Sequence, residues 1–233
     1  MEGRNRVGVV VAMDGPSGSG KSSTARAVAS RLGLRYLDTG AMYRAMTWWM
    51  LEHAVDVEDP AAVAAHADQP LIISGTDAAA PTITVDGTDV AGPIRGPEVT
   101  AAVSAVSAVP EIRERLLVEQ HDIIGSGDIV VEGRDIGTVV APDAAVKVFL
   151  TADPQARAVR RAAEQSGSDV EATQRDLVRR DRFDSGRATS PLAMAADARH
   201  IDTTPYTLEE VVSQVVALVH QATQRIGAAR FDS

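Results

Sequence analysis

The residues best suited to chemistry lie near the start of the chain, in the run GPSGSGKS at 15–22. This run fits G-x-x-x-x-G-K-S, the pattern of a loop that holds the phosphates of a nucleotide. Glycines let backbone N–H groups approach a phosphate, Lys21 can bridge the outer phosphate oxygens, and the Ser22 hydroxyl can contact Mg²⁺. We therefore expect a nucleotide at Gly15, Pro16, Ser17, Gly18, Ser19, Gly20, Lys21, Ser22 and Ser23.

Other chemically useful side chains follow the ends of two predicted strands. Glu132 ends the run VVE at 130–132, where a carboxylate either orders Mg²⁺ through water or only solvates a loop. Arg134 and Asp135 come next, at the carboxyl edge where open α/β sheets bind ligands. Tyr43 and Arg44 follow the second strand at the same edge. They suit a sugar or base and a second phosphate, or are plain surface contacts.

Arginine is concentrated in one segment that contains no predicted strand. Eight of the 21 arginines lie between 153 and 187, namely Arg157, Arg160, Arg161, Arg175, Arg179, Arg180, Arg182 and Arg187. A cationic segment of this kind suits a lid that closes over a phosphoryl group in transfer. The alternative is a solvated helix with ion pairs one turn apart, such as Arg157 and Arg161 facing Glu164.

Five apolar runs predict the strands that must position these residues, at 7–13, 34–37, 128–133, 145–152 and 198–203. Helical patterns lie at 22–32, 41–53, 98–125 (interrupted at Pro110) and 207–226, followed by a tail after Gly227. Strands that alternate with helices predict an α/β fold around a parallel sheet. Short alternating runs between 70 and 94, punctuated by Gly, Pro and Asp-Gly, predict an antiparallel insert.

The composition narrows the classes of protein and partner. The 233 residues suit one large domain or a core with appendages. A net charge of −9 leaves no broad basic face for a nucleic acid, so we expect none to bind. No run approaches the ~18 apolar residues of a membrane span, and we expect no secretory leader, because no charged and then apolar segment with a small-residue cleavage site stands near the start. Cysteine is absent, which suits a reducing compartment, so we expect a soluble, cytoplasmic monomer without a membrane partner.

Taken together, several motifs resemble bacterial cytidylate kinases, which move the γ-phosphoryl group of ATP to CMP or dCMP. The resemblance runs nearly end to end, and its motifs are far more specific than the phosphate-binding loop alone. They are GPSGSGKSS at 15–23, LDTGAMYR at 37–44, GTDVAGPIR at 87–95, Ser104 with PEIR at 110–113, EGRDIGTVV at 132–140, VKVFLTA at 146–152, RRDRFDSGRATSPL at 179–192 and IDTT at 201–204.

The resemblance implies a three-layer P-loop kinase fold with a five-stranded parallel sheet, an antiparallel insert and a short lid. The segments would be a core at 1–38, a CMP-binding region at 39–125 with the insert at about 70–97, more core at 126–156, a lid at 157–187, and core with a C-terminal tail at 188–233. The resemblance also implies ATP as phosphoryl donor, Mg²⁺ as cofactor, and CMP or dCMP as the small-molecule acceptor.

Residue roles carry over at the matching motif positions. Arg44, Arg134 and Arg187 would hold the CMP phosphate, Arg180 and Asp184 the ribose hydroxyls, and Thr39 and Tyr43 would line the pocket. Ser104, Arg113 and Asp135 would read the base, which suits cytosine because its amino donor lies beside an acceptor nitrogen.

Around the transferring group the resemblance places Lys21, Arg157, Arg161 and Arg182, and at the metal it places Ser22 with Glu132, the latter through water. Ser185 and Gly186 depart from the larger polar residues that many family members carry there. Such a site needs no general base, because the acceptor phosphate oxygen is already an anion.

Two other kinds of nucleotide protein compete with this interpretation. A kinase for a different monophosphate or a polyol-like acid would keep the loop but leave Ser104, Arg113, Asp135 and the insert unexplained. A nucleotide-dependent switch should carry an N/T-K-x-D base motif, which is absent. A structural protein with a vestigial loop is disfavoured because Lys21 and Ser22 are both intact.

Overall fold

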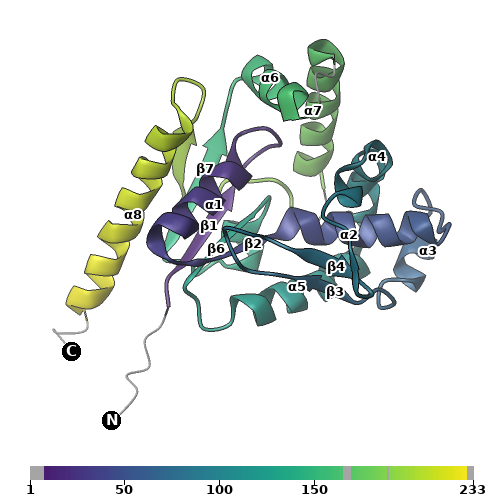
Figure 1. Ribbon diagram of the computed structural model, residues 1–233, viewed down its shortest axis with the longest axis horizontal. Coiled ribbons are helices and arrows are strands. Elements are labelled where there is room, and N and C mark those ends of the chain that lie inside the picture. Colours follow the sequence, from purple (N-terminus) through teal and green to yellow (C-terminus); the bar gives the residue numbers. More distant parts are fainter. Residues whose placement is uncertain (1–7, 165–168, 188, 230–233) are drawn as a thin grey trace, which may run out of the picture.

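The central sheet of the computed structural model, which describes residues 8–164, 169–187 and 189–229, has five parallel strands. These are β1 (Val10–Asp14), β2 (Arg35–Asp38), β6 (Ile129–Gly133), β7 (Val146–Thr151) and β8 (Arg199–Asp202), in the order β2-β6-β1-β7-β8. Figure 1 shows the sheet with helices on both faces. The predicted three-layer α/β fold with a five-stranded parallel sheet is confirmed.

The register of the strands brings the chemical residues to one edge. Asp14 of β1 lies beside Gly133 of β6, and Asp38 of β2 lies beside Glu132. Val11 is fully buried, as expected for a strand covered on both faces. The carboxyl ends of β1, β2 and β6 therefore converge where the phosphate-binding loop begins.

Helices complete the two outer layers. On one face lie α1 (Lys21–Leu32) and α8 (Leu208–Ala229), and on the other α2 (Thr39–Glu52), α5 (Pro110–Ile124) and the single wide turn η2 (Ile136–Val140). The last helix continues past Gly227 to Ala229, so the predicted start of the tail was wrong, and residues 230–233 lie outside the described part. Ala228 and Ala229 are strong helix formers, so the helix continues through them although the apolar periodicity ends at Ile226.

The predicted antiparallel insert is also confirmed. It contains β3 (Ile72–Ser74), β4 (Ile83–Val85) and β5 (Thr88–Asp89), in the order β3-β4-β5. Around it lie α3 (Pro60–Ala65), the 3-10 turn η1 (Pro93–Arg95) and α4 (Pro97–Val106). Asp86 and Gly87 both have positive φ, 51° and 80°, as the tight turn between β4 and β5 requires. The indole N–H of Trp49 donates to Asp86 Oδ2 at 3.0 Å and ties the insert to α2.

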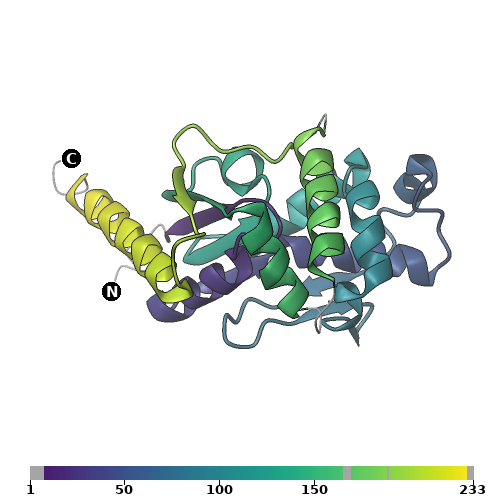
Figure 2. The ribbon, with the colours of Figure 1, turned by 90° about the horizontal axis from the view of Figure 1, so that it is seen from above.

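The arginine-rich segment forms two helices, α6 (Pro154–Glu164) and α7 (Val170–Ser185), which pack against each other. They lie over the carboxyl edge of the sheet (Figure 1, Figure 2). Arg157 donates to Asp181 Oδ2 of α7 at 2.6 Å, so this arginine joins two helices. The side chain of Glu164 lies outside the described part of the chain. Over the described ranges, no helix is both long enough and apolar enough to span a bilayer.

Candidate active site

The phosphate-binding loop joins β1 to α1 and depends on its glycines. Gly15, Gly18 and Gly20 have φ values of +146°, +77° and +86°. A Cβ atom at Gly15 would lie 2.0 Å from the carbonyl oxygen of Leu150, so no larger residue fits there. Gly20 caps α1 without a side-chain bond, which leaves the backbone N–H groups of this helix end suited to bind an anion.

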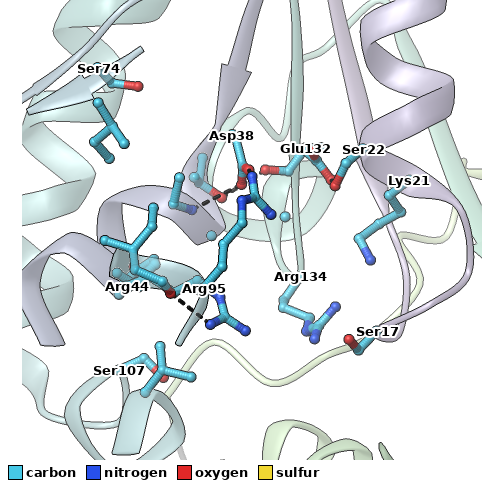
Figure 3. Close-up of a pocket in the computed structure, with 18 of the residues that line it drawn as sticks. Ser17, Lys21, Ser22, Asp38, Arg44, Ser74, Arg95, Ser107, Glu132 and Arg134 are labelled. Atoms are coloured by element: carbon cyan, nitrogen blue, oxygen red, sulfur yellow. Dashed lines mark hydrogen bonds and ion pairs between the residues drawn. The ribbon is translucent and has the colours of Figure 1, made fainter. Parts of the chain in front are cut away.

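Lys21 curves back over this loop and is 8 % exposed. Its Nζ donates to the carbonyl oxygen of Pro16 at 2.8 Å. Burial, and then the positive charge of Arg134, lower the pKa of the Lys21 ammonium. A buried ammonium group that bonds to a backbone carbonyl oxygen can exchange this partner for phosphate oxygens. Figure 3 shows Lys21 and Arg134 directed into the same hollow.

Glu132 is held by two hydroxyl groups at the end of β6. Ser22 Oγ donates to Glu132 Oε2 at 3.0 Å, and Tyr36 Oη donates to Glu132 Oε1 at 2.5 Å. Burial, and then the charge of Asp38, raise the pKa of the Glu132 carboxyl group. The carboxylate is thereby aligned with the loop serine, as Figure 3 shows. Tyr36 was missed by sequence reasoning because a tyrosine within a short strand carries no motif signal.

The donor set beside the loop consists of oxygen atoms alone, the ligands that Mg²⁺ prefers. Among the described residues, no three His, Cys, Asp or Glu side chains lie close enough to enclose a metal ion. A protein site with so few anionic ligands fits Mg²⁺ well, because this ion keeps several waters and takes further oxygens from nucleotide phosphates.

A cavity of about 480 Å³ extends from the loop along the carboxyl edge of the sheet. Lys21 and eight arginines line it, against the four carboxylates of Asp38, Glu132, Asp135 and Asp184; the arginines are Arg26, Arg44, Arg95, Arg113, Arg134, Arg161, Arg180 and Arg187. The chain as a whole carries a net charge of −9. The excess of cations is therefore local, and it makes the cavity a receptor for anions.

Arginines crowd one another in this cavity. Arg44 donates from Nη1 to the carbonyl oxygen of Ile94 and to Thr100 Oγ1, both at 3.0 Å. Burial, and then the charges of Arg180 and Arg161, lower the pKa of Arg44 to about 9. Burial and the charge of Arg134 lower the pKa of Arg180 to about 10. A bound phosphate relieves this repulsion, since it adds negative charge among the guanidinium groups.

Asp184 orders two of these arginines and is almost fully buried. Arg134 Nε donates to its Oδ2 at 2.8 Å, and Arg187 Nη2 donates to its Oδ1 at 2.5 Å. Burial raises the pKa of Asp184, but the charges of Arg134 and Arg187 outweigh it, and the pKa lies below its ordinary value. Arg134 also donates from Nη1 to the carbonyl oxygen of Gly15 at 2.7 Å, so one arginine reaches from Asp184 to the loop.

At the far end of the cavity, Arg113 and Asp135 form a buried ion pair. The guanidinium of Arg113 lies 5.2 Å from the centre of the Tyr43 ring. Ser104 Oγ and Arg113 Nε are buried and have no hydrogen-bond partner within the described part of the chain. Polar groups in this state can bind a polar, planar ligand without losing an internal bond.

Most of the sequence-predicted site residues line this one cavity. They are Ser17, Gly18, Gly20, Lys21, Ser22, Ser23, Thr39, Tyr43, Arg44, Ser104, Arg113, Glu132, Arg134, Asp135, Arg161, Arg180, Asp184 and Arg187. Ser19 is fully buried, and Arg157 lies behind the loop, where its Nη1 donates to the carbonyl oxygen of Ser17 at 3.0 Å. Arg182 is exposed and lines a separate hollow with Gln155 and Phe183. Gly15, Pro16, Ser19, Arg157 and Arg182 are therefore not in the cavity wall.

Sequence reasoning also missed several other polar residues of the wall, among them Asp38, Arg95 and Ser107. Asp38 Oδ1 accepts from the N–H of Ala41 at 2.9 Å and caps α2, and its Oδ2 lies 4.0 Å from Arg95 Nη2. Asp38 could have been predicted from its place at the end of a strand, since the same signal predicted Glu132.

Comparison with known proteins gives one consistent result. The family model described as cytidylate kinase matches residues 11–221. A cytidylate kinase of Streptomyces griseus is 61 % identical over 216 residues, which covers 92 % of this chain and 94 % of the relative. One from Streptomyces avermitilis is 60 % identical over 215 residues, covering 91 % and 93 %.

The fold also matches a solved structure of low sequence identity. An uncharacterized protein from Eubacterium ventriosum has a TM-score of 0.52 and 12 % identity, covering 91 % of this chain and 98 % of its own. This match speaks for the fold alone. The family match spans nearly the whole chain and agrees with the motifs gathered around the cavity, so this chain belongs to the cytidylate kinase family and is a nucleotide-binding kinase.

Proposed function

We propose that the chain transfers the γ-phosphoryl group of ATP to CMP or dCMP, giving ADP and CDP or dCDP. One observation carries the proposal: a single cavity joins the phosphate-binding loop to a cluster of arginines and, beyond them, to Ser104, Arg113 and Asp135. A donor at the loop and an acceptor at the far end would meet phosphate to phosphate. The relatives from Streptomyces griseus and Streptomyces avermitilis are named as this enzyme, and the similarity covers more than nine-tenths of each of them.

The residues beside the loop fit a complex of ATP with Mg²⁺. Ser22 would bind the ion directly and Glu132 through water, while Tyr36 holds the Glu132 carboxylate in place. When bound, Mg²⁺ neutralises charge on the outer phosphates. Lys21 lies close enough to the loop to hold the same phosphates from the protein side.

The arginines suit the acceptor phosphate and ribose. Arg44, Arg134 and Arg187 would hold the phosphate of CMP, because planar guanidinium groups bind phosphate oxygens in pairs. Arg180 and Asp184 would bind the ribose hydroxyls, and Asp184 has lone pairs left beside its two arginines. Thr39 and Tyr43 complete the wall.

The polar residues at the far end match cytosine. Asp135 would accept from the amino group of the base, while Arg113 and Ser104 would contact its acceptor atoms. Uracil presents a carbonyl oxygen and an N–H at the same positions. It would place an acceptor against Asp135 and leave buried partners unpaired.

No proton needs to be removed by a side chain, because the acceptor oxygen is already anionic. The protein would contribute alignment and positive charge from Lys21 and Arg161, and Arg157 would act from behind the loop, where it bonds to the carbonyl oxygen of Ser17. Closure of α6 and α7 would exclude water. Arg182 would join this group only after α7 moves, because it is exposed in this structure.

Two further properties belong to this proposal. The first is that the chain acts as a monomer, as expected from its sequence. The absence of cysteine supports a reducing, cytoplasmic location.

The test is a coupled assay of ADP release with ATP and Mg²⁺ against CMP, dCMP, UMP, AMP, GMP and shikimate. We expect rapid turnover with CMP and dCMP, slow turnover with UMP, and none with the others. Lys21→Ala should lower the rate about a thousandfold, while Lys147→Ala, which alters the only other lysine of the chain, should not. A different preferred acceptor would refute the base-binding assignment, and nucleotide binding without transfer would favour a switch.

A further inference from the structure

We infer that Ser107 is a positioning residue for the acceptor phosphate, and that its hydroxyl group fixes the direction of Arg187. The inference rests on the proposed function, because it takes Arg187 as a phosphate ligand. Ser107 ends α4, is 4 % exposed and lines the cavity. Figure 3 places it on the wall of the same hollow as Arg134 and Lys21.

The hydrogen bonds of the Ser107 hydroxyl have only one consistent direction. Arg187 Nη2 donates to Ser107 Oγ at 2.9 Å, and Ser107 Oγ donates to the carbonyl oxygen of Ser104 at 3.2 Å. A guanidinium can only donate and a carbonyl can only accept. The hydroxyl therefore directs its proton to Ser104 and its lone pair to Arg187.

The backbone of Ser107 serves a second arginine. Its carbonyl oxygen accepts from Arg113 Nη1 at 3.2 Å. Burial, and among the charges that of Arg113, lower the pKa of Arg187, so the two guanidinium groups repel each other. Ser107 lies between them and binds both. Any substitution at 107 keeps the carbonyl, so the contact to Arg113 survives and only the contact to Arg187 is lost.

The contact matters because Arg187 follows the end of α7 and must be directed into the cavity. Asp184, the other anchor of Arg187, belongs to the last turn of the same helix. Ser107 provides a fixed point on a different element, since α4 packs on α2. Arg187 Nε is buried with no partner among the described residues, so the Nε–H group of this arginine can still donate to an anion.

A purely structural role for Ser107 makes a different prediction. The serine is also the cap of α4, but the cap uses its backbone N–H, which bonds to Val103 and Ala105. Alanine keeps that bond. If the hydroxyl served only the helix end, its removal would lower stability and leave CMP affinity unchanged.

The experiment compares wild type with Ser107→Ala by calorimetric titration with CMP and by steady-state kinetics. We expect the dissociation constant and KM for CMP to rise about tenfold. KM for ATP and the ratio of CMP to UMP turnover should stay unchanged, because Arg113 and Asp135 keep their contacts. Ser107→Thr, which retains a hydroxyl group, should restore most of the affinity.

Two comparisons isolate the contact. Ser213→Ala is the matched control, because Ser213 also accepts from an arginine, Arg31, but on the exposed surface of α8; it should leave CMP binding unchanged. In an Arg187→Ala background, Ser107→Ala should cause no further loss. Should the alanine variant fail to fold, Ser107→Cys keeps the volume and offers only a weak acceptor, and the same tenfold rise is expected.

CMP binding by Ser107→Ala, or by its cysteine substitute, equal to that of wild type would overturn the inference. So would an undiminished loss in the Arg187→Ala background. If the wild type still phosphorylates CMP, either result refutes the role of Ser107 and leaves the proposed function intact. A wild type that does not phosphorylate CMP instead removes the proposed function.

Discussion

At the scale of single residues, the site is built from pairs in which one member holds the other. Tyr36 and Ser22 hold Glu132, and Asp184 holds Arg134. The members assigned to phosphate or metal under the proposed function were predicted, because they belong to motifs or follow predicted strands. Ser22 and Asp184 also belong to motifs and were predicted, but Tyr36 was not, because its hydrogen bond to Glu132 depends on the pairing of β2 with β6, which no sequence motif reveals.

Asp135 gives the first prediction at this scale. Asp135→Asn keeps an acceptor oxygen but adds donor hydrogens, so it can bind uracil as well as cytosine. We expect the ratio of kcat/KM for CMP to that for UMP to fall at least tenfold. The ratio is measured with both acceptors at saturating ATP. An unchanged ratio would exclude Asp135 from reading the base.

Asp14, at the end of β1, should make stability depend on pH. It accepts from the N–H groups of Ile136 and Gly137 at 2.8 and 2.7 Å. Burial raises the pKa of Asp14 to about 6. Since the folded state then binds the proton more tightly than the unfolded state, the stabilisation is complete below the ordinary pKa of 3.8 and is lost as the pH rises through 6.

The measurement compares wild type with Asp14→Asn, which cannot titrate, in urea unfolding at pH 5 and pH 7. From pH 5 to pH 7, the unfolding free energy of wild type should fall by about 1 kcal/mol more than that of the variant. A constant difference between the two proteins would contradict a raised pKa at this carboxyl group.

At the scale of elements, the strands and most helices followed from local patterns. Continuous β-branched runs predicted β1, β6 and β7, and the Asp-Gly pair predicted the tight turn after β4. Side-chain orientation on α6 and α7 was less predictable. Eight arginines in one segment marked it as functional, yet only tertiary packing decides that Arg161 lines the cavity while Arg182 does not.

Arg182 therefore tests whether α7 moves during the reaction. If closure brings this exposed arginine to the transferring group, Arg182→Ala should lower kcat about a hundredfold and change KM for CMP little. Arg179→Ala is the matched control, because Arg179 lies on the same helix, is exposed and pairs with Asp176. Equal kcat values for the two variants would remove Arg182 from the catalytic group.

At the scale of the whole molecule, charge is distributed unevenly. The chain has a net charge of −9, but its cavity is lined by more cations than anions. The net charge predicts that no long polyanion binds, but it does not predict whether a small anion binds, because a small anion needs only a local excess of cations. Residues of the core, the insert and the α6–α7 segment line one cavity, which two nucleotides share under the proposed function.

The most direct test of this shared cavity is calorimetric titration with a dinucleotide in which adenosine and cytidine are joined through a chain of phosphates. If the two nucleotides bind end to end, this compound should bind with one-to-one stoichiometry at least a hundredfold more tightly than ATP or CMP alone. The analogue with uridine in place of cytidine should bind more weakly. An affinity no greater than that of ATP alone would show that the cavity does not hold donor and acceptor together.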